Sequence, residues 1–148
     1  MVVQKRRKKT STVSHTPDQP QAVLLLDQLP CCKDLHYWPQ RWMGFPADIP
    51  PGEQLVTCFR PFLIHLIQLQ LSRSTICKHA NNLWVLGGEI IRDLHETPAL
   101  RNISIPKLLF DTVDEDGPLP YGWEPTAALA SFESTCRKLR RFLELQVH

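Results

Sequence analysis

Long hydrophobic runs are absent near the start of this 148-residue sequence, where the continuous apolar run, Ala22 to Leu26, is far too short to span a membrane. We therefore expect no membrane partner. The net charge is also small, +2, so composition alone does not establish a nucleic-acid-binding protein. Glycine is scarce relative to proline, six against thirteen, which favours a few helices joined by long extended connections.

Paired cysteine motifs are missing as well. Five cysteines stand at positions 31, 32, 58, 77 and 136. Their odd number, with no signal peptide before them, favours a reducing compartment. The last three fall on or beside the apolar stripe of an expected helix, so we interpret them as small core residues. The Cys31-Cys32 pair and His36 have no matching second pair, so we expect no zinc site, no other metal and no cofactor.

Catalytic motifs are the third absence. The sequence contains no G-x-S-x-G, no H-E-x-x-H, no phosphate-binding glycine loop and no credible cysteine–histidine arrangement. The six histidines are scattered, and His65 and His79 are isolated on expected helices, where we interpret them as core-edge or surface residues. We therefore expect a protein that is not an enzyme.

What is present begins with a basic segment. Residues 1 to 20 have no periodic apolar pattern, which predicts a disordered arm preceding a single helical domain over residues 21 to 148. The arm contains an unbroken basic run: Lys5, Arg6, Arg7, Lys8 and Lys9. Such a run serves as a solubilising tail, as an arm that follows phosphates or, in a eukaryote, as a nuclear-import signal.

Residues 21 to 54 combine apolar residues with turn-forming ones. The stretch "AVLLLDQLPCC" is compatible with a short strand or a helical turn. The stretch "HYWPQRWMGFPADIPPGE" is dense in aromatic residues and prolines, which excludes a regular helix by the sequence rules for proline. We expect these aromatic residues to form a packed strap across a core; a base-stacking platform is the alternative.

Apolar periodicity predicts three longer helices, at about residues 52–70, 73–96 and 126–145. The fold class is therefore mostly α, a small helical bundle with long connections rich in proline and aromatic residues. In the first helix, Pro61 predicts either a kink or a restart after Arg60.

The second helix has the clearest boundaries and an unusual interior. Ser72 is the expected N-cap, because its hydroxyl can accept the Thr75 amide. The apolar stripe from Ile76 to Leu94 includes Gly87, which predicts a close approach of another helix there. The alternative is a helix break at Gly87-Gly88.

This helix pair carries a family resemblance. The stretch "LQLSRSTICKHANNLWVLGGEI" resembles the N-terminal core-binding (SAM-like) domain of tyrosine recombinases and phage integrases over residues 55 to 96. The matching positions are Leu71, Ser72, Thr75, Ile76, Leu83 and Trp84. The resemblance implies a helical bundle that clamps one side of duplex DNA. The family's catalytic domain has no room here, and neither Tyr37 nor Tyr121 has a suitable setting, so recombination by this chain is excluded.

The start of the second helix is the candidate DNA contact. Five side chains stand there beside free backbone amides, and these groups hold phosphate oxygens in other proteins. They are Arg73, Ser74, Thr75, Lys78 and Asn82. The alternative is a capped surface helix with ordinary charges.

The leading functional hypothesis is a small non-catalytic DNA-binding or accessory protein of a mobile genetic element. The rival is a protein–protein interaction module that docks a partner through the aromatic strap or the last helix. In a bacterium we expect the protein in the cytoplasm, associated with the nucleoid. In a eukaryote we expect it in the nucleus.

Deletion of residues 1 to 17 is expected to leave the melting temperature nearly unchanged, because this segment removes no apolar face from the domain. Thermal unfolding followed by circular dichroism measures the difference. A large drop would show that the arm is docked on the domain.

Overall fold

A computed structural model describes residues 17–114, 118–120, 122–123 and 126–146. The secondary-structure elements of these residues are all helices and include no strand, which confirms the predicted fold class. The α-helices are α2 (Gln19–Gln28), α3 (Trp38–Trp42), α4 (Ile49–Gln68), α5 (Arg73–Glu96), α6 (Ile105–Thr112) and α7 (Ala127–Gln146). Short 3-10 helices are η1 (Leu35–Tyr37), η2 (Pro46–Asp48) and η3 (Pro98–Asn102).

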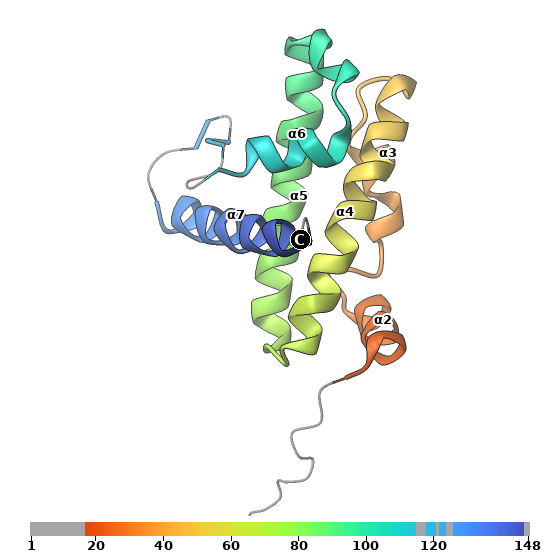
Figure 1. Ribbon diagram of the computed structural model, residues 1–148, viewed down its shortest axis with the longest axis vertical. Helices are drawn as coiled ribbons and strands as arrows, with labels where there is room; N and C mark the ends of the chain where they lie inside the picture. Colours follow the sequence, from red (N-terminus) through yellow and green to blue (C-terminus); the bar gives the residue numbers. More distant parts are fainter. Residues whose placement is uncertain (1–16, 115–117, 121, 124–125, 147–148) are drawn as a thin grey trace, which may run out of the picture.

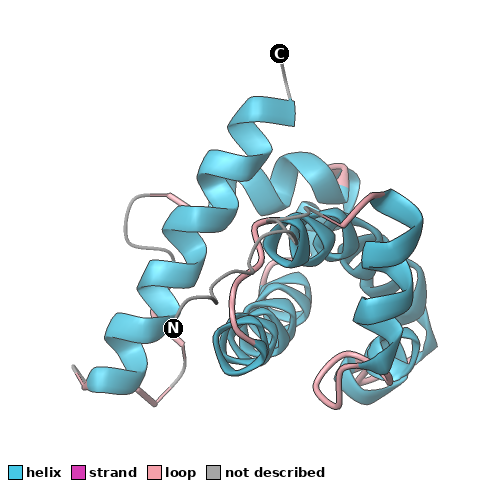
Figure 2. Ribbon diagram, turned by 90° about the horizontal axis from the view of Figure 1, so that it is seen from below, coloured by secondary structure: helices cyan, strands magenta, loops and turns pink. Residues whose placement is uncertain are grey.

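Helices α4 and α5 lie side by side in the middle of the molecule (Figure 1). Helices α2 and α3 pack on one side of this pair and α7 on the other, as the view from below also shows (Figure 2). The core lies between these layers and is filled by fully buried side chains such as Phe59, Phe62, Leu83 and Phe132. None of the described helices is long and apolar enough to cross a membrane.

The three predicted helices are confirmed at α4, α5 and α7, with small shifts at their ends. Helix α4 continues through Pro61 as one element, so the restart after Arg60 does not occur. Buried neighbours on both sides of the proline, Phe59 and Phe62, hold the two halves against the same core. Tertiary packing thus outweighs the hydrogen bond that proline cannot donate.

The segment from 21 to 54 is more regular than the sequence indicates. Helix α2 begins inside the expected arm, at Gln19, and Asp18 forms a capping box with Gln21. Its ten residues replace the expected short strand or turn. Three prolines, Pro20, Pro39 and Pro46, stand in first turns of helices, where no backbone N–H is required. The stretch rich in aromatic residues and prolines is not one regular helix, as predicted, because it is divided into η1, α3, η2 and the start of α4, with residues 43 to 45 outside any helix.

Helix α5 runs without a break through both glycines, and its Ser72 cap accepts the Thr75 amide at 3.1 Å as predicted. Gly87 is buried, but its close neighbour is the indole of Trp42 on α3 rather than the backbone of another helix. A Cβ atom at Gly87 would lie 2.2 Å from that ring, whereas one at Gly88 would lie 3.6 Å from it. The glycine therefore makes room for one aromatic side chain.

The predicted aromatic strap is packed only in part: Trp38 and Trp42 form a cluster with Trp84 and Phe59, whereas Tyr37 is 54% exposed and Phe45 45%. Trp42 lies at the centre of this cluster. Its indole stacks on Trp84 and meets Trp38 and Phe59 edge-on, with centroids 5.6 to 6.4 Å apart. The Trp42 Nε1–H donates to the Trp84 carbonyl oxygen at 3.0 Å. Rings engaged in this way fill the interior and are not presented as a base-stacking platform.

Replacement of Gly87 by alanine is expected to lower the free energy of unfolding by about 1–3 kcal/mol, because the new methyl group overlaps the Trp42 ring. Gly88→Ala is the matched control and should be neutral or stabilising by up to about 1 kcal/mol, since its Cβ meets ordinary contact distances. Urea denaturation of both variants gives the two values.

A double-mutant cycle identifies the cause. In a Trp42→Ala background, Gly87→Ala should cost much less than in the wild type, because the two residues are in direct contact. Equal costs in both backgrounds would contradict the packing account.

Candidate nucleic-acid interface

The first turn of α5 has the cap geometry expected from the sequence. Ser74 is exposed and Thr75 is half-buried. The Ser72 hydroxyl accepts the Thr75 amide and donates to the Thr75 Oγ1 at 2.8 Å. The first intrahelical bond runs from the Ile76 amide to the Ser72 carbonyl, so the amides of Arg73 and Ser74 precede the helical ladder. The five cations of the arm, residues 5 to 9, lie outside the described residues.

Asn82 does not belong to this exposed turn. Its side chain is only 8% exposed, and its Nδ2 donates to Thr135 Oγ1 at 2.8 Å and to the Ser131 carbonyl at 3.2 Å. Both partners lie on α7, which covers this side of α5. The expectation that Asn82 faces a phosphate was therefore wrong, because the covering helix is distant in sequence.

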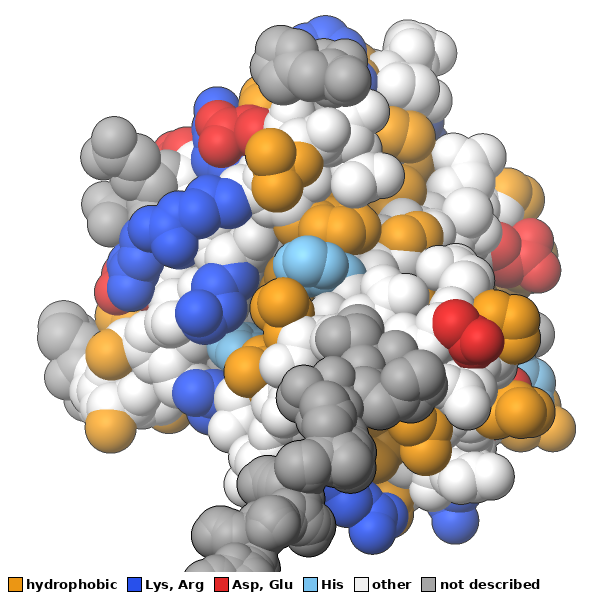
Figure 3. Space-filling model, turned by 60° about the horizontal axis from the view of Figure 1, so that its bottom comes forward, with side chains coloured by type: hydrophobic (Ala, Val, Ile, Leu, Met, Phe, Trp, Pro, Cys, Tyr) orange, Lys and Arg blue, Asp and Glu red, His pale blue; other side chains and the backbone are white. Residues whose placement is uncertain are grey.

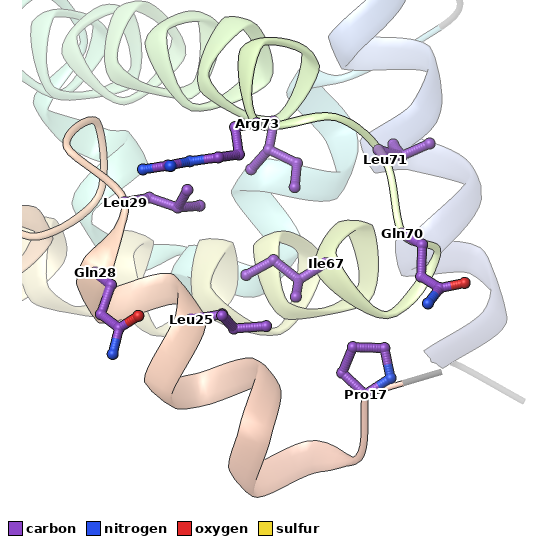
Figure 4. Close-up of a pocket in the computed structure, with 9 residues that line it drawn as sticks. Pro17, Leu25, Gln28, Leu29, Ile67, Gln70, Leu71 and Arg73 are labelled. Carbon is purple, nitrogen blue, oxygen red and sulfur yellow. The ribbon is translucent and has the colours of Figure 1, made fainter. Parts of the chain in front are cut away.

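The two cations of the predicted site lie on different sides of α5. Arg73 extends over the end of α2, beside Gln28 and Leu29 (Figure 4). Lys78 instead lies on the α7 side, where it and Lys138 both act on the buried His79. Five residues along a helix turn the direction of a side chain by about 140°. The structure therefore does not bring Arg73 and Lys78 together.

Lys78 is joined by three cations of α7. Lys78, Arg137, Lys138 and Arg141 are all exposed, and we call them the basic patch. The described residues provide no ion pair to any of the four. In Figure 3 the blue Lys and Arg side chains gather along one side of this face. Four exposed positive charges without an ion pair among the described residues, on two neighbouring helices, make a surface suited to polyanions.

Arg140 shows that α7 does not use all its cations in the same way. Its Nε lies 3.4 Å from a Glu144 oxygen, and its guanidinium lies 4.5 Å from the centre of the Phe110 ring. This arginine therefore holds α7 against α6. Positive charge near the C-terminus of a helix is favoured by the helix dipole, so the sequence pattern alone does not indicate that these cations and Lys78 form one surface.

Below the patch, His79 is fully buried between α5 and α7. Its Nδ1 lies 2.7 Å from Thr135 Oγ1, and its Nε2 is buried without a hydrogen-bond partner. Burial, and then the positive charges of Lys78 and Lys138, lower the pKa of His79 to about 4. The interpretation of this histidine as a core-edge or surface residue was wrong, and its neutral form is part of the packing.

A second polar cluster lies at the far end of α5. Asp48 is fully buried and accepts hydrogen bonds from the Gly44 and Phe45 amides, from His95 Nε2 at 2.6 Å and from Arg101 at 2.8 Å. Burial raises the pKa of Asp48, but these donors, Arg101 first, outweigh it and lower the pKa to about 2. Every oxygen of this carboxylate is occupied, so the cluster ties η2, α5 and η3 together.

The cysteines form neither a metal site nor a uniform set of core thiols. Cys31 and Cys77 are joined by a disulfide that links the turn after α2 to α5, so Cys77 is not the small core thiol expected from its position. The remaining three are free, and burial raises the pKa of the Cys32 and Cys136 thiols to about 12. Within the described residues no group of three His, Cys, Asp or Glu side chains could hold a metal ion.

The depressed pKa of His79 predicts a loss of stability in mild acid. The unfolded chain binds a proton near the ordinary pKa of 6.5, whereas the folded chain resists protonation down to about 4. The contribution of His79 to the free energy of unfolding should therefore be fully present above pH 6.5. It should fall by on the order of 3 kcal/mol as the pH drops to about 4. Urea unfolding of wild type and His79→Gln across this range measures the difference. Parallel profiles for the two proteins would contradict this assignment.

Comparisons with known proteins add no family to this geometry. No family model, no curated protein and no solved structure matches the chain. The likeness to core-binding domains therefore depends on the residues of the helix pair alone.

Proposed function

We propose that this protein binds duplex DNA through its phosphate backbone and performs no catalysis. The observation that carries the proposal is the basic patch, in which four exposed cations from α5 and α7 have no ion-pair partner among the described residues. Lysine and arginine contacts to phosphates supply most of the affinity of sequence-independent DNA binding.

The first turn of α5 adds groups of the same kind. Ser74 precedes Lys78 by one helical turn and therefore shares its side of the helix. The amides that precede the helical ladder and the positive end of the helix dipole favour an anion at this turn. A phosphate next to Lys78 would thus be held by charge and by hydrogen bonds together.

The arm supplies a second basic element in the sequence. Lys5 to Lys9 precede α2, whose first residues lie at the same end of the molecule as the α4–α5 turn (Figure 1). An arm of this composition can follow the phosphates beyond the folded domain. Its contribution must be measured separately from that of the patch.

An accessory role in a mobile genetic element is the form of this function that the resemblance to core-binding domains supports. Such a role requires a helical DNA-binding unit without a nucleophile. Tyr37, the described tyrosine, is 54% exposed, with its ring against His36 and Arg41, and the sequence contains none of the catalytic motifs considered above. We therefore include the absence of catalysis in the proposal.

Replacing Lys78 and Lys138 together with alanine should weaken DNA binding uniformly across sequences. The slope of log affinity against log salt should shrink by up to about two units, because two phosphate contacts are lost. Fluorescence anisotropy with a labelled duplex at several salt concentrations, in protein lacking residues 1 to 17, gives the slope.

Two controls make the result specific to the patch. Lys107→Ala removes an exposed lysine of α6 that pairs with Asp111, and Arg73→Ala removes the cation on the α2 side. Both should leave the slope nearly unchanged. If the truncated protein shows no salt-sensitive binding, or if all three variants lose the same amount, the basic patch is not a DNA interface.

A further inference from the structure

An apolar hollow opens between the C-terminal ends of α4 and α7. Its volume is about 230 Å³, and Leu66, Leu69 and Leu145 contribute to its lining. Lys138 and Arg141 of the basic patch stand at the same hollow. The Phe142 ring of α7 fills part of the space between α7 and α4, because it packs on Phe62 with ring centroids 5.7 Å apart.

A second hollow lies on the other side of the α4–α5 turn. Its volume is about 340 Å³, and Leu71 lines both hollows, so this residue forms a ridge between them. Figure 4 shows Leu25 of α2 and Ile67 of α4 at the second hollow, with the Arg73 side chain extending across its upper side. This surface, the two hollows with the ridge at Leu71, is called the turn surface below.

Large hydrophobic side chains remain exposed around the turn surface. Leu25 is 43% exposed, Leu69 54% and Leu145 71%. Exposed apolar side chains that gather at hollows of the surface often mark a binding site. Cations stand at both hollows, Arg73 at one and Lys138 with Arg141 at the other.

We propose that the turn surface binds an acidic amphipathic helix of a protein partner. A helix presents apolar side chains at i, i+3 or i+4 and i+7, which suits two hollows separated by a ridge. Glutamate or aspartate on the flanks of such a helix would meet Arg73 at one hollow and Lys138 with Arg141 at the other, and none of these three has an ion pair within the described part of the chain.

Charge and shape favour this occupant over others. The chain's own first segment carries Lys5 to Lys9, and like charges oppose its binding beside three cations. A lipid surface offers no protruding side chains for two concave hollows. Duplex DNA matches the cations but has no groups that fill the leucine-lined space. The proposal does not depend on DNA binding, although both ligands use Lys138 and Arg141, so a partner helix and DNA are expected to compete.

The test uses a fluorescein-labelled designed peptide of about 18 residues, which forms five helical turns. Its leucines follow the i, i+3, i+7 pattern and its flanks carry glutamates; a control peptide has serine in place of each leucine. The full-length protein should bind the leucine peptide and not the serine peptide in fluorescence anisotropy. Equal binding of both peptides would show simple charge attraction and overturn the proposal.

Matched variants locate the site. Leu69→Ser should weaken peptide binding by about tenfold or more, because the residue is exposed at the hollow and its truncation removes an apolar anchor. Leu119→Ser is the control, since Leu119 is also exposed, at 65% against 54% for Leu69, and does not line either hollow. Circular dichroism and thermal unfolding confirm that both variants fold. An unchanged affinity for Leu69→Ser would reject this site.

Two further probes distinguish the rival occupants. Labelled duplex DNA should bind Leu69→Ser as it binds wild type; a parallel loss would assign the turn surface to DNA and overturn the proposal. Vesicles of phosphatidylcholine and phosphatidylserine should show no binding that depends on Leu69, and a loss in the variant would point to a membrane occupant instead. Failure of DNA binding with retained peptide binding would reject the proposed function alone.

Discussion

The packing of α7 on α5 is the interaction on which both proposed surfaces depend. Its centre is polar: Thr135 meets His79 at 2.7 Å and Asn82 at 2.8 Å in a buried setting. Buried polar groups are costly when they lose their partners, so these contacts specify one position of α7 along α5. That position brings Lys138 near Lys78 and places Phe142 against Phe62 of α4. Without it, neither the basic patch nor the hollow at the end of α4 would exist.

On the other side of the α4–α5 pair, the fit of Trp42 against Gly87 and the charge cluster around Asp48 hold α3, η2 and η3 in place. The Trp42 indole occupies the space that Gly87 leaves on α5, and its Nε1–H is satisfied by a carbonyl of the same helix. Asp48 collects donors from three elements and remains ionised in the interior, which is acceptable because each donor replaces a lost water. Aromatic packing and a satisfied carboxylate thus fix α3, η2 and η3, and leave the α4–α5 turn at the other end uncovered.

The end of the molecule at the α4–α5 turn combines exposed apolar side chains with exposed positive charges. Exposed leucines stand between cations, and the cations lack ion pairs among the described residues. A polyanion is attracted by the charges alone, at long range and in a salt-dependent way. A partner helix also needs the apolar hollows, whose contribution resists salt. The two proposed ligands would therefore use overlapping groups through different forces, so the two proposals together predict that DNA and a partner helix compete for this surface.

The sequence by itself determined the central helices: the bounds of α4, α5 and α7, the Ser72 cap and the burial of Gly87 all follow from periodicity and from groups within a few residues of one another. It left α2 open between a strand and a helical turn and did not locate the five-residue α3, whose first turn contains Pro39. Only the tertiary structure decided that Asn82 is covered, that Cys31 meets Cys77 and that Arg73 and Lys78 face different neighbours. Each of these facts is a contact between segments far apart in the chain, and local pattern carries no information about which distant surface will cover a given face.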